Sequence, residues 1–322
     1  MDRRSASPED LPPLELRTLR ELDVAEPSTP GGRAHISAAS GIVRRGTYAY
    51  VIGDDELSVG VFDLSTTEPG TLRRALPGDL PADEGARKRE KPDLEALTAL
   101  PPIEQSPHGG LLGIGSGSDP SRDRAFFWAL EADGSLHGES WTVDFHPVYE
   151  ELRRELGNVN IEGAAVFHDC LWLFNRGNEA GSHNAVAEVS IRDLSTSIHG
   201  DREVEPDELV AVREYELGQV EGVRLCFSDA TTLLEGLVAF TASAEGADGD
   251  IHGSLVGTID SEGEVRRLRT IDRRWKVEGV HATVDSGVVD LVFVCDQDDP
   301  DVPSPLLSGT MPLEGRFERE EA

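Results

Sequence analysis

The sequence of 322 residues lacks long hydrophobic runs. None reaches 18 apolar residues, so we expect no transmembrane helix. The first 13 residues, MDRRSASPEDLPP, carry charge and proline but no apolar segment, so we expect no secretory signal. A cytoplasmic protein without a membrane partner is therefore predicted.

Cysteine is scarce. Cys170, Cys226 and Cys295 are too few and too scattered for a disulfide framework, and each lies in an apolar run. We expect three buried, unpaired side chains that pack as small hydrophobic groups.

Positive charge is also in short supply. Lys and Arg total 30 against 61 Asp and Glu, for a formal net charge of −31, and three of the 30 are lysines: Lys88, Lys91 and Lys276. So negative a surface repels phosphate backbones, which excludes nucleic acid as an expected partner and disfavours anionic membranes. We expect a monomer whose partner is a small molecule.

One short pattern repeats along the chain. A polar residue is followed by a small one and then by an apolar run, and the pairs recur every 55 to 67 residues. The five pairs are Ser40-Gly41, Glu95-Ala96, Glu162-Gly163, Glu221-Gly222 and Glu278-Gly279. A period near 60 suits a β-propeller blade with generous loops.

Each repeat carries further strand-like runs, separated by Gly and Asp, that amount to four strands per unit. The fifth repeat ends after its third strand, and residues 14–22, LELRTLREL, match the missing fourth. An N-terminal strand that completes the last blade would cover an exposed edge. We therefore predict an all-β fold, a five-bladed β-propeller over residues 14–313, with disordered tails at 1–13 and 314–322. The alternative is six blades, one of them degenerate.

Helical signal is weak. Residues 146–158 place Val148, Leu152 and Leu156 on one face and end near Gly157, which predicts a short helix. Residues 79–91 have no apolar face and are expected to form a mobile loop.

The first strand of each blade lines a propeller's channel, so the repeated polar residues should form a ring. Its members would be Ser40, Glu95, Glu162, Glu221 and Glu278. The following Gly or Ala fits the crowding of inner strands. Like-charged carboxylates ~5 Å apart cost about 3 kcal/mol per pair at an effective dielectric near 20. A hard cation would relieve this repulsion, as would protonation.

Calcium suits such a ring, because it takes six to eight oxygen ligands in flexible geometry. No Cys/His cluster has zinc spacing. The alternative is that each glutamate binds backbone amides of the next blade, without metal.

The ring resembles that of the calcium-activated nucleotidases, or apyrases. Residues 39–64, ASGIVRRGTYAYVIGDDELSVGVFDL, look like that family's first blade, and KVEGV at 276–280 looks like its last. The resemblance implies a central calcium held by Ser and Glu side chains. Glu221 departs from it, since the family has serine at the fourth position. The pattern is also similar to phytase-like and esterase-like propellers and to an uncharacterised bacterial family of such domains.

Further polar residues follow the second strands, near one mouth of the channel. Arg176 could hold a phosphate or carboxylate, or instead pair with a ring glutamate. Asp296 could transfer protons during a reaction, or it could simply be a solvated surface residue. His281, three residues after Glu278, is a candidate general base or a hydrogen-bonded core residue.

Two functions are compatible with these residues. The first is a calcium-dependent hydrolase of small anionic phosphoesters or lactone-type molecules, with Arg176, His281 and Asp296 as catalytic residues. The second is a non-catalytic propeller that binds a ligand or protein at its mouth, with a structural ring.

Overall fold

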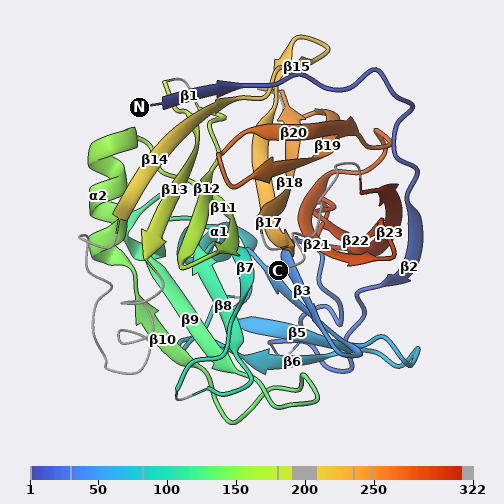
Figure 1. Ribbon diagram of the computed structural model, residues 1–322. Coiled ribbons are helices and arrows are strands. Elements are labelled where there is room, and N and C mark those ends of the chain that lie inside the picture. Colours follow the sequence, from blue (N-terminus) through green and yellow to red (C-terminus); the bar gives the residue numbers. More distant parts are fainter. Residues whose placement is uncertain are drawn as a thin grey trace.

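Five blades, each with four antiparallel strands, surround a central axis in the computed structural model (Figure 1). The structure describes residues 2–29, 31–81, 83–104, 106–179, 181–190, 209–234, 236–246 and 249–313. The innermost strands contact one another in the cyclic order β3, β7, β11, β17, β21 and back to β3. The predicted five-bladed propeller is confirmed, and the described residues contain no sixth blade.

Each blade begins with its inner strand. Blade 1 is β3 (Ala39–Arg45), β4 (Tyr48–Gly53), β5 (Ser58–Asp63) and β6 (Thr71–Arg74). Blade 2 is β7 (Leu94–Leu100), β8 (Gly110–Gly115), β9 (Arg124–Ala129) and β10 (Trp141–Asp144). Blade 3 is β11 (Ile161–Phe167), β12 (Cys170–Asn175), β13 (Asn184–Ser190) and β14 (Leu209–Glu216). Blade 4 is β17 (Cys226–Leu234), β18 (Leu237–Glu245), β19 (Ile251–Asp260) and β20 (Val265–Thr270). Blade 5 is β21 (Val277–Asp285), β22 (Val288–Cys295), β23 (Pro305–Pro312) and β2 (Arg17–Glu21).

The hydrophobic core is divided into five clusters, one between each pair of neighbouring blades. Every sheet is thus covered on both faces. This is why a second strand such as β12, CLWLFN, reads as a continuous apolar run rather than as an alternating one.

The N-terminal strand β2 pairs antiparallel with β23 and completes the last blade, as predicted. Leu14, Leu16 and Leu22, which flank β2, are buried. The propeller is therefore closed by hydrogen bonds between the two ends of the fold.

The prediction of a loose tail over 1–13 is wrong for residues 2–13. Strand β1 (Asp2–Ser5) pairs in parallel with β14, and the Glu9 amide then donates to the Leu268 carbonyl at 2.7 Å in blade 4. The segment runs along the outer edges of blades 3 and 4 before it reaches blade 5 (Figure 1). Outer strands have unpaired backbone groups, and this segment satisfies some of them. Residues 314–322 lie outside the described residues.

Helix α2 (His146–Leu156) forms where it was predicted and buries Val148, Tyr149, Leu152 and Leu156. Residues 79–91 contain helix α1 (Glu84–Glu90), where we expected a mobile loop. Asp83 caps this helix, and Arg87 anchors it to Asp55 and Glu56 on blade 1. These ion pairs attach the helix to blade 1, although the helix has no apolar face that could pack against it.

A 3₁₀ turn, η1 (Pro120–Arg122), precedes β9, and a two-strand hairpin, β15 (Gln219–Val220) and β16 (Val223–Arg224), precedes blade 4.

The three cysteines are free thiols; Cys226 and Cys295 are buried, as expected, whereas Cys170 is half-buried. Among the described residues, no helix combines the length and apolar character needed to cross a membrane.

Candidate metal centre

A β-bulge interrupts the pairing of every inner strand with its neighbour. The residue at the bulge is Ser40 in β3, Glu95 in β7, Glu162 in β11, Ser228 in β17 and Glu278 in β21. Bulges redirect a side chain, and here all five occupy the same place in their blades. These five residues are the ring of this propeller.

A small residue follows four of the five ring positions, the exception being Asp229 after Ser228, and crowding explains it. A Cβ atom added to Gly163 would lie 2.6 Å from the Ala230 backbone nitrogen. One added to Gly279 would lie 3.1 Å from the Gly41 Cα. The predicted collision between neighbouring inner strands is confirmed.

Glu221 does not belong to the ring. It lies in the two-residue turn between β15 and β16, where Glu221 and Gly222 have φ of +52° and +84°. Positive φ at both positions is typical of a type I′ hairpin turn, and this turn favours the glycine of the Glu-Gly pair. The Glu221 side chain is exposed and pairs with Arg273 and His252. Ser228 takes the fourth ring position instead.

The ring glutamates face a cavity of about 190 Å³ on the propeller axis, which we call the axial cavity. Six carboxylates line it against two basic groups, Arg176 and Lys276. The six are Asp54, Glu95, Glu162, Glu245, Glu278 and Asp296. The negative charges therefore exceed the positive ones by four if all these groups are ionised.

Arg176, at the end of β12, is the central counter-ion. Its side chain is 7% exposed; Nη1 lies 3.4 Å from Glu162 Oε2 and 4.0 Å from Glu278 Oε2, and Nη2 binds Glu245. Burial lowers the pKa of Arg176, but these carboxylates outweigh it and raise the pKa above its ordinary value. The predicted alternative of a pair with ring glutamates is the arrangement present.

All three lysines of the chain gather at this mouth. Lys276 Nζ lies 3.0 Å from Asp296 Oδ2 and 3.7 Å from Glu278 Oε1. Lys91 Nζ contacts Asp54 and lies 2.7 Å from Asp93 Oδ1. Lys88 lines an adjoining cavity that shares Asp54 and Asp296 with the axial one. The scarce ammonium groups thus lie at or beside the carboxylates of the axial cavity.

Even so, the ring carboxyls have elevated pKa values. Burial raises the pKa of Glu278 to about 8, although Arg176 and Lys276 oppose the shift. Burial, with the nearby charges of Glu162 and Asp54, raises the pKa of Glu95 well above its ordinary value. The pKa of Glu162 is raised by burial as well. Burial is thus the main reason that these carboxyls favour the protonated form.

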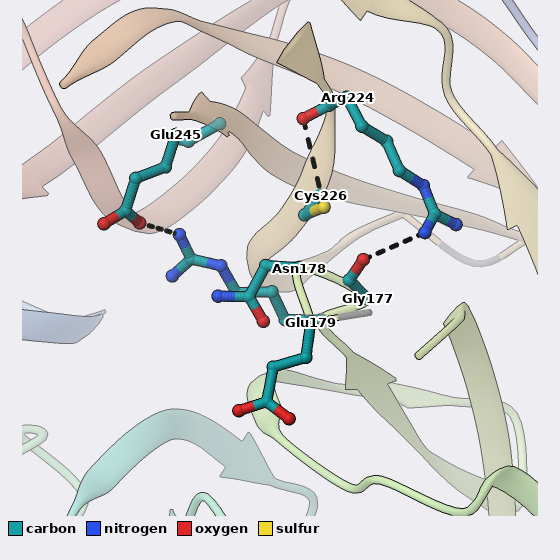
Figure 2. A pocket seen from close by; sticks show the side chains of 8 residues that line it. Gly177, Asn178, Glu179, Arg224, Cys226 and Glu245 are labelled. Atoms are coloured by element: carbon teal, nitrogen blue, oxygen red, sulfur yellow. Dashed lines mark hydrogen bonds and ion pairs between the residues drawn. The ribbon is translucent and has the colours of Figure 1, made fainter. Parts of the chain in front are cut away.

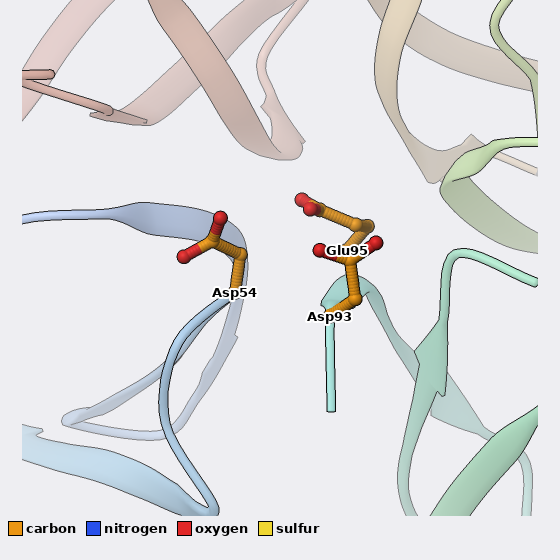
Figure 3. A group of neighbouring side chains, drawn as sticks. All are labelled: Asp54, Asp93 and Glu95. Atoms are coloured by element: carbon orange, nitrogen blue, oxygen red, sulfur yellow. The ribbon is translucent and has the colours of Figure 1, made fainter. Parts of the chain in front are cut away.

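Glu95 also belongs to a second group of oxygen ligands. One carboxylate oxygen each from Asp54, Asp93 and Glu95 lies within 4.8 Å of the others (Figure 3). Asp54 follows β4 in blade 1, whereas Asp93 and Glu95 begin blade 2. Asp93 carries no signal in the sequence, because its closeness to Asp54 depends on how two blades meet.

The donor set fits a hard cation such as calcium. All the acidic ligands are carboxylate oxygens, the kind calcium prefers. Glu278 Oε2 is buried and accepts no hydrogen bond, so it has an unused lone pair beside the cavity. The two ring serines differ from the ring glutamates, because each serine hydroxyl donates a hydrogen bond to the neighbouring blade. Ser40 Oγ donates to the Leu94 carbonyl at 2.6 Å and Ser228 Oγ to the Val277 carbonyl at 3.1 Å.

The three predicted catalytic residues are not brought together. Asp296 and Arg176 both line the axial cavity. His281 lines a separate cavity formed by the opposite halves of the inner strands. Three residues along β21 span about 10 Å, which carries His281 away from Glu278.

A cavity of about 180 Å³ adjoins the axial one between blades 3 and 4 and shares Arg176 and Glu245 with it (Figure 2). Arg224 lies on its wall and donates to the carbonyls of Gly177 and Ser182 at 3.0 and 3.1 Å. Arg224 was not predicted from the sequence, because a lone arginine in a hairpin forms no motif.

The chain matches one family profile and is similar to several solved structures. The profile of a family described as "Family of unknown function (DUF6929)" matches residues 35–311. No match was found among curated proteins. The catalytic domain of a GH62 α-L-arabinofuranosidase from Coprinopsis cinerea is 10% identical, with a TM-score of 0.51 over 93% of this chain and 98% of that one. Glutaminyl cyclase from Myxococcus xanthus is 11% identical, with a TM-score of 0.45 over 93% and 100%. The likeness to the arabinofuranosidase concerns the fold alone.

Proposed function

This chain belongs to the DUF6929 family of unknown function, and we propose that it is a calcium-dependent propeller acting on small anionic molecules at the axial cavity. The observation that carries the proposal is the surplus of carboxylates there, six against two basic groups, together with a buried Glu278 Oε2 that accepts no hydrogen bond. Glu95, Glu162 and Glu278 would hold the ion, with Ser40 beside them.

The corrected ring strengthens the resemblance to the calcium-activated nucleotidases. Glu221 departs from that family's pattern at the fourth position, where the family has serine. Ser228 is the bulge residue of β17 and so corresponds to this position, while Ser40 is the ring serine that lines the axial cavity. The order Ser, Glu, Glu, Ser, Glu around the axis supports calcium as the ion.

The reaction we propose is hydrolysis of a phosphoester or lactone. Bound calcium would supply Lewis acidity, which polarises a phosphoryl or carbonyl oxygen. Asp296 lines both the axial cavity and the adjoining one, and it would accept a proton from an attacking water. Arg176 would orient the anionic substrate after exchanging part of its contact with Glu245, which is partly exposed. His281 takes no part.

The test is an assay of phosphate esters, nucleotides and lactones with calcium or with chelator. We expect calcium-dependent turnover that Glu278→Gln abolishes and Arg176→Ala reduces, whereas Glu221→Gln leaves it unchanged. A KM effect without a kcat effect in Arg176→Ala would mean equal binding of ground and transition states.

A second function is favoured by one observation. Three carboxylates already pair with the Arg176 guanidinium, and His281, one of the three predicted catalytic residues, lies at the other end of the channel. A non-catalytic, ligand-binding propeller needs neither group. Calcium binding without turnover on any substrate of the panel would favour this function.

A further inference from the structure

The far end of the channel holds a cavity of about 470 Å³, within the usual range of small-molecule sites. All five inner strands contribute to it, each through the half that lies beyond its ring residue. We call it the distal cavity. Nothing in the proposed function uses it.

Its charge is opposite to that of the axial cavity. Arg44 and Arg45 of β3 line it, and no Asp or Glu is among its lining residues in the described part of the chain. In a protein with 61 acidic and 30 basic residues this is an unusual surface. The two guanidinium groups make no ion pair or hydrogen bond within the described ranges.

Two buried polar atoms there have no partner. They are Nε of Arg44 and Nδ1 of His281. Buried donors and acceptors are nearly always paired, so an unpaired set beside a cavity indicates a missing partner. Burial, with the charges of Arg44 and Arg45, lowers the pKa of His281 to about 4. The neutral imidazole can thus add a hydrogen bond but no charge at pH 7.

The rest of the wall is apolar or hydroxylic. Val43, Leu233, Leu234 and Val284 supply apolar surface, and threonines such as Thr231 supply hydroxyl groups. The arginines could bind an acidic group through charge-assisted hydrogen bonds. The apolar wall would then cover an attached hydrocarbon portion.

From this arrangement we infer that the distal cavity is a second ligand site, for a small organic anion with an apolar body. A carboxylate or phosphate group would bind Arg44, Arg45 and His281. Its apolar portion would lie against Leu233, Leu234 and Val284.

Isothermal titration calorimetry on the full chain, in chelator, tests this. The probes are octanoate and octyl phosphate, with octan-1-ol and acetate as analogues that lack the charge or the apolar body. We expect both amphipathic anions to bind at one site, and both analogues to bind at least 10-fold more weakly. Octanoate and octyl phosphate also distinguish a carboxylate site from a phosphate site.

Variants locate the binding. Arg44→Gln with Arg45→Gln should weaken it at least 10-fold, whereas Arg17→Gln with Arg154→Gln, which removes equal charge from exposed positions, should not. Arg45→Gln alone, at an exposed side chain, should weaken it about 3-fold and remains informative if the double variant does not fold. Glu162→Gln should bind normally.

The inference is overturned if neither amphipathic anion binds, or if the Arg44 and Arg45 variants bind as the unmodified chain does. It is also overturned if the control pair weakens binding equally. Loss of binding in Glu162→Gln would place the ligand at the axial cavity instead. The result does not depend on the calcium proposal, because chelator removes calcium from these titrations.

Discussion

Nη1 of Arg176 lies 3.4 Å from Oε2 of Glu162, and the same buried guanidinium also faces Glu278 and Glu245. One side chain from blade 3 thereby offsets charges from blades 3, 4 and 5. The carboxylates that line the axial cavity still outnumber its basic groups, so a further cation would reduce the remaining negative charge.

Arg176→Gln should destabilise the chelator-treated protein by about 3 kcal/mol or more, because removal of one partner leaves buried charges uncompensated. Calcium should stabilise this variant more than it stabilises the unmodified chain. Denaturant unfolding with and without calcium measures both effects. Arg154→Gln, at an exposed ion pair, is the control and should cost less than about 1 kcal/mol. Equal stability of Arg176→Gln and the unmodified chain would contradict the proposed role of Arg176.

Calcium should raise the melting temperature, since a ligand that binds only the folded state stabilises it. The gain is about 2.7 kcal/mol at a concentration 100-fold above Kd. Magnesium should do less, because it resists an all-protein oxygen cage. Glu162→Gln should abolish the response and Glu221→Gln should retain it. A response lost in both variants would show that overall negative charge, and not the ring, attracts the ion.

Stability without metal should fall as pH rises from about 5 to 8. A carboxyl whose pKa is higher in the folded than in the unfolded state binds more protons when folded between the two values, so raising the pH there favours unfolding. The pKa of Glu278, at about 8, sets the upper end. Protons compete with the metal, so calcium should raise the melting temperature more at pH 8 than at pH 5.5. A calcium effect independent of pH would mean that these carboxyls do not bind the ion.

Removal of residues 1–24 should cause a large loss of thermal stability. The deletion strips β2 from β23 and exposes the sites of Leu14, Leu16 and Leu22, each worth about 2 kcal/mol when buried. Removal of residues 1–8 deletes β1 but leaves blade 5 intact, so it should cost much less. Calorimetric melting of the two truncated chains makes the comparison. If both melted alike, closure by β2 would contribute nothing special.

Gly163→Ala should destabilise the fold by roughly 1–3 kcal/mol, because its Cβ would meet the Ala230 and Asp229 backbone. Gly85→Ala, in exposed helix α1, meets only side-chain ends beyond 3.5 Å and should be neutral or stabilising. Urea unfolding of both variants tests the crowding at the ring. A Gly163→Ala protein as stable as the unmodified chain would show that the inner strands can separate freely.

The fold was predictable because every blade repeats its strand pattern, and because the missing fourth strand of blade 5 had a counterpart at residues 14–22. Four of the five ring positions followed from the same repeat. The fifth was misassigned because a Glu-Gly pair serves equally well in a type I′ turn. Ser228-Asp229-Ala230, a polar pair before a small residue in an apolar run, was the signal for the true position.

The ion pairs of the site were less predictable. Lys91 lies in the connection that leads to blade 2, and Asp54 follows β4 of blade 1, so their contact does not follow from spacing along the chain. Lys276 and Asp296 flank the paired ends of the neighbouring strands β21 and β22, so their contact depends on the register of that hairpin. His281 was misplaced for a simpler reason. A strand passes from one mouth of the channel to the other, and three residues are enough to change sides.

The most direct test of the central claim is a crystal structure of the protein grown with calcium, with anomalous data to identify the ion. We predict one calcium peak in the axial cavity, with carboxylate oxygens of Glu95, Glu162 and Glu278 about 2.3–2.6 Å away. An axial cavity that holds only water at millimolar calcium, with Arg176 still bound to the glutamates, would contradict the claim.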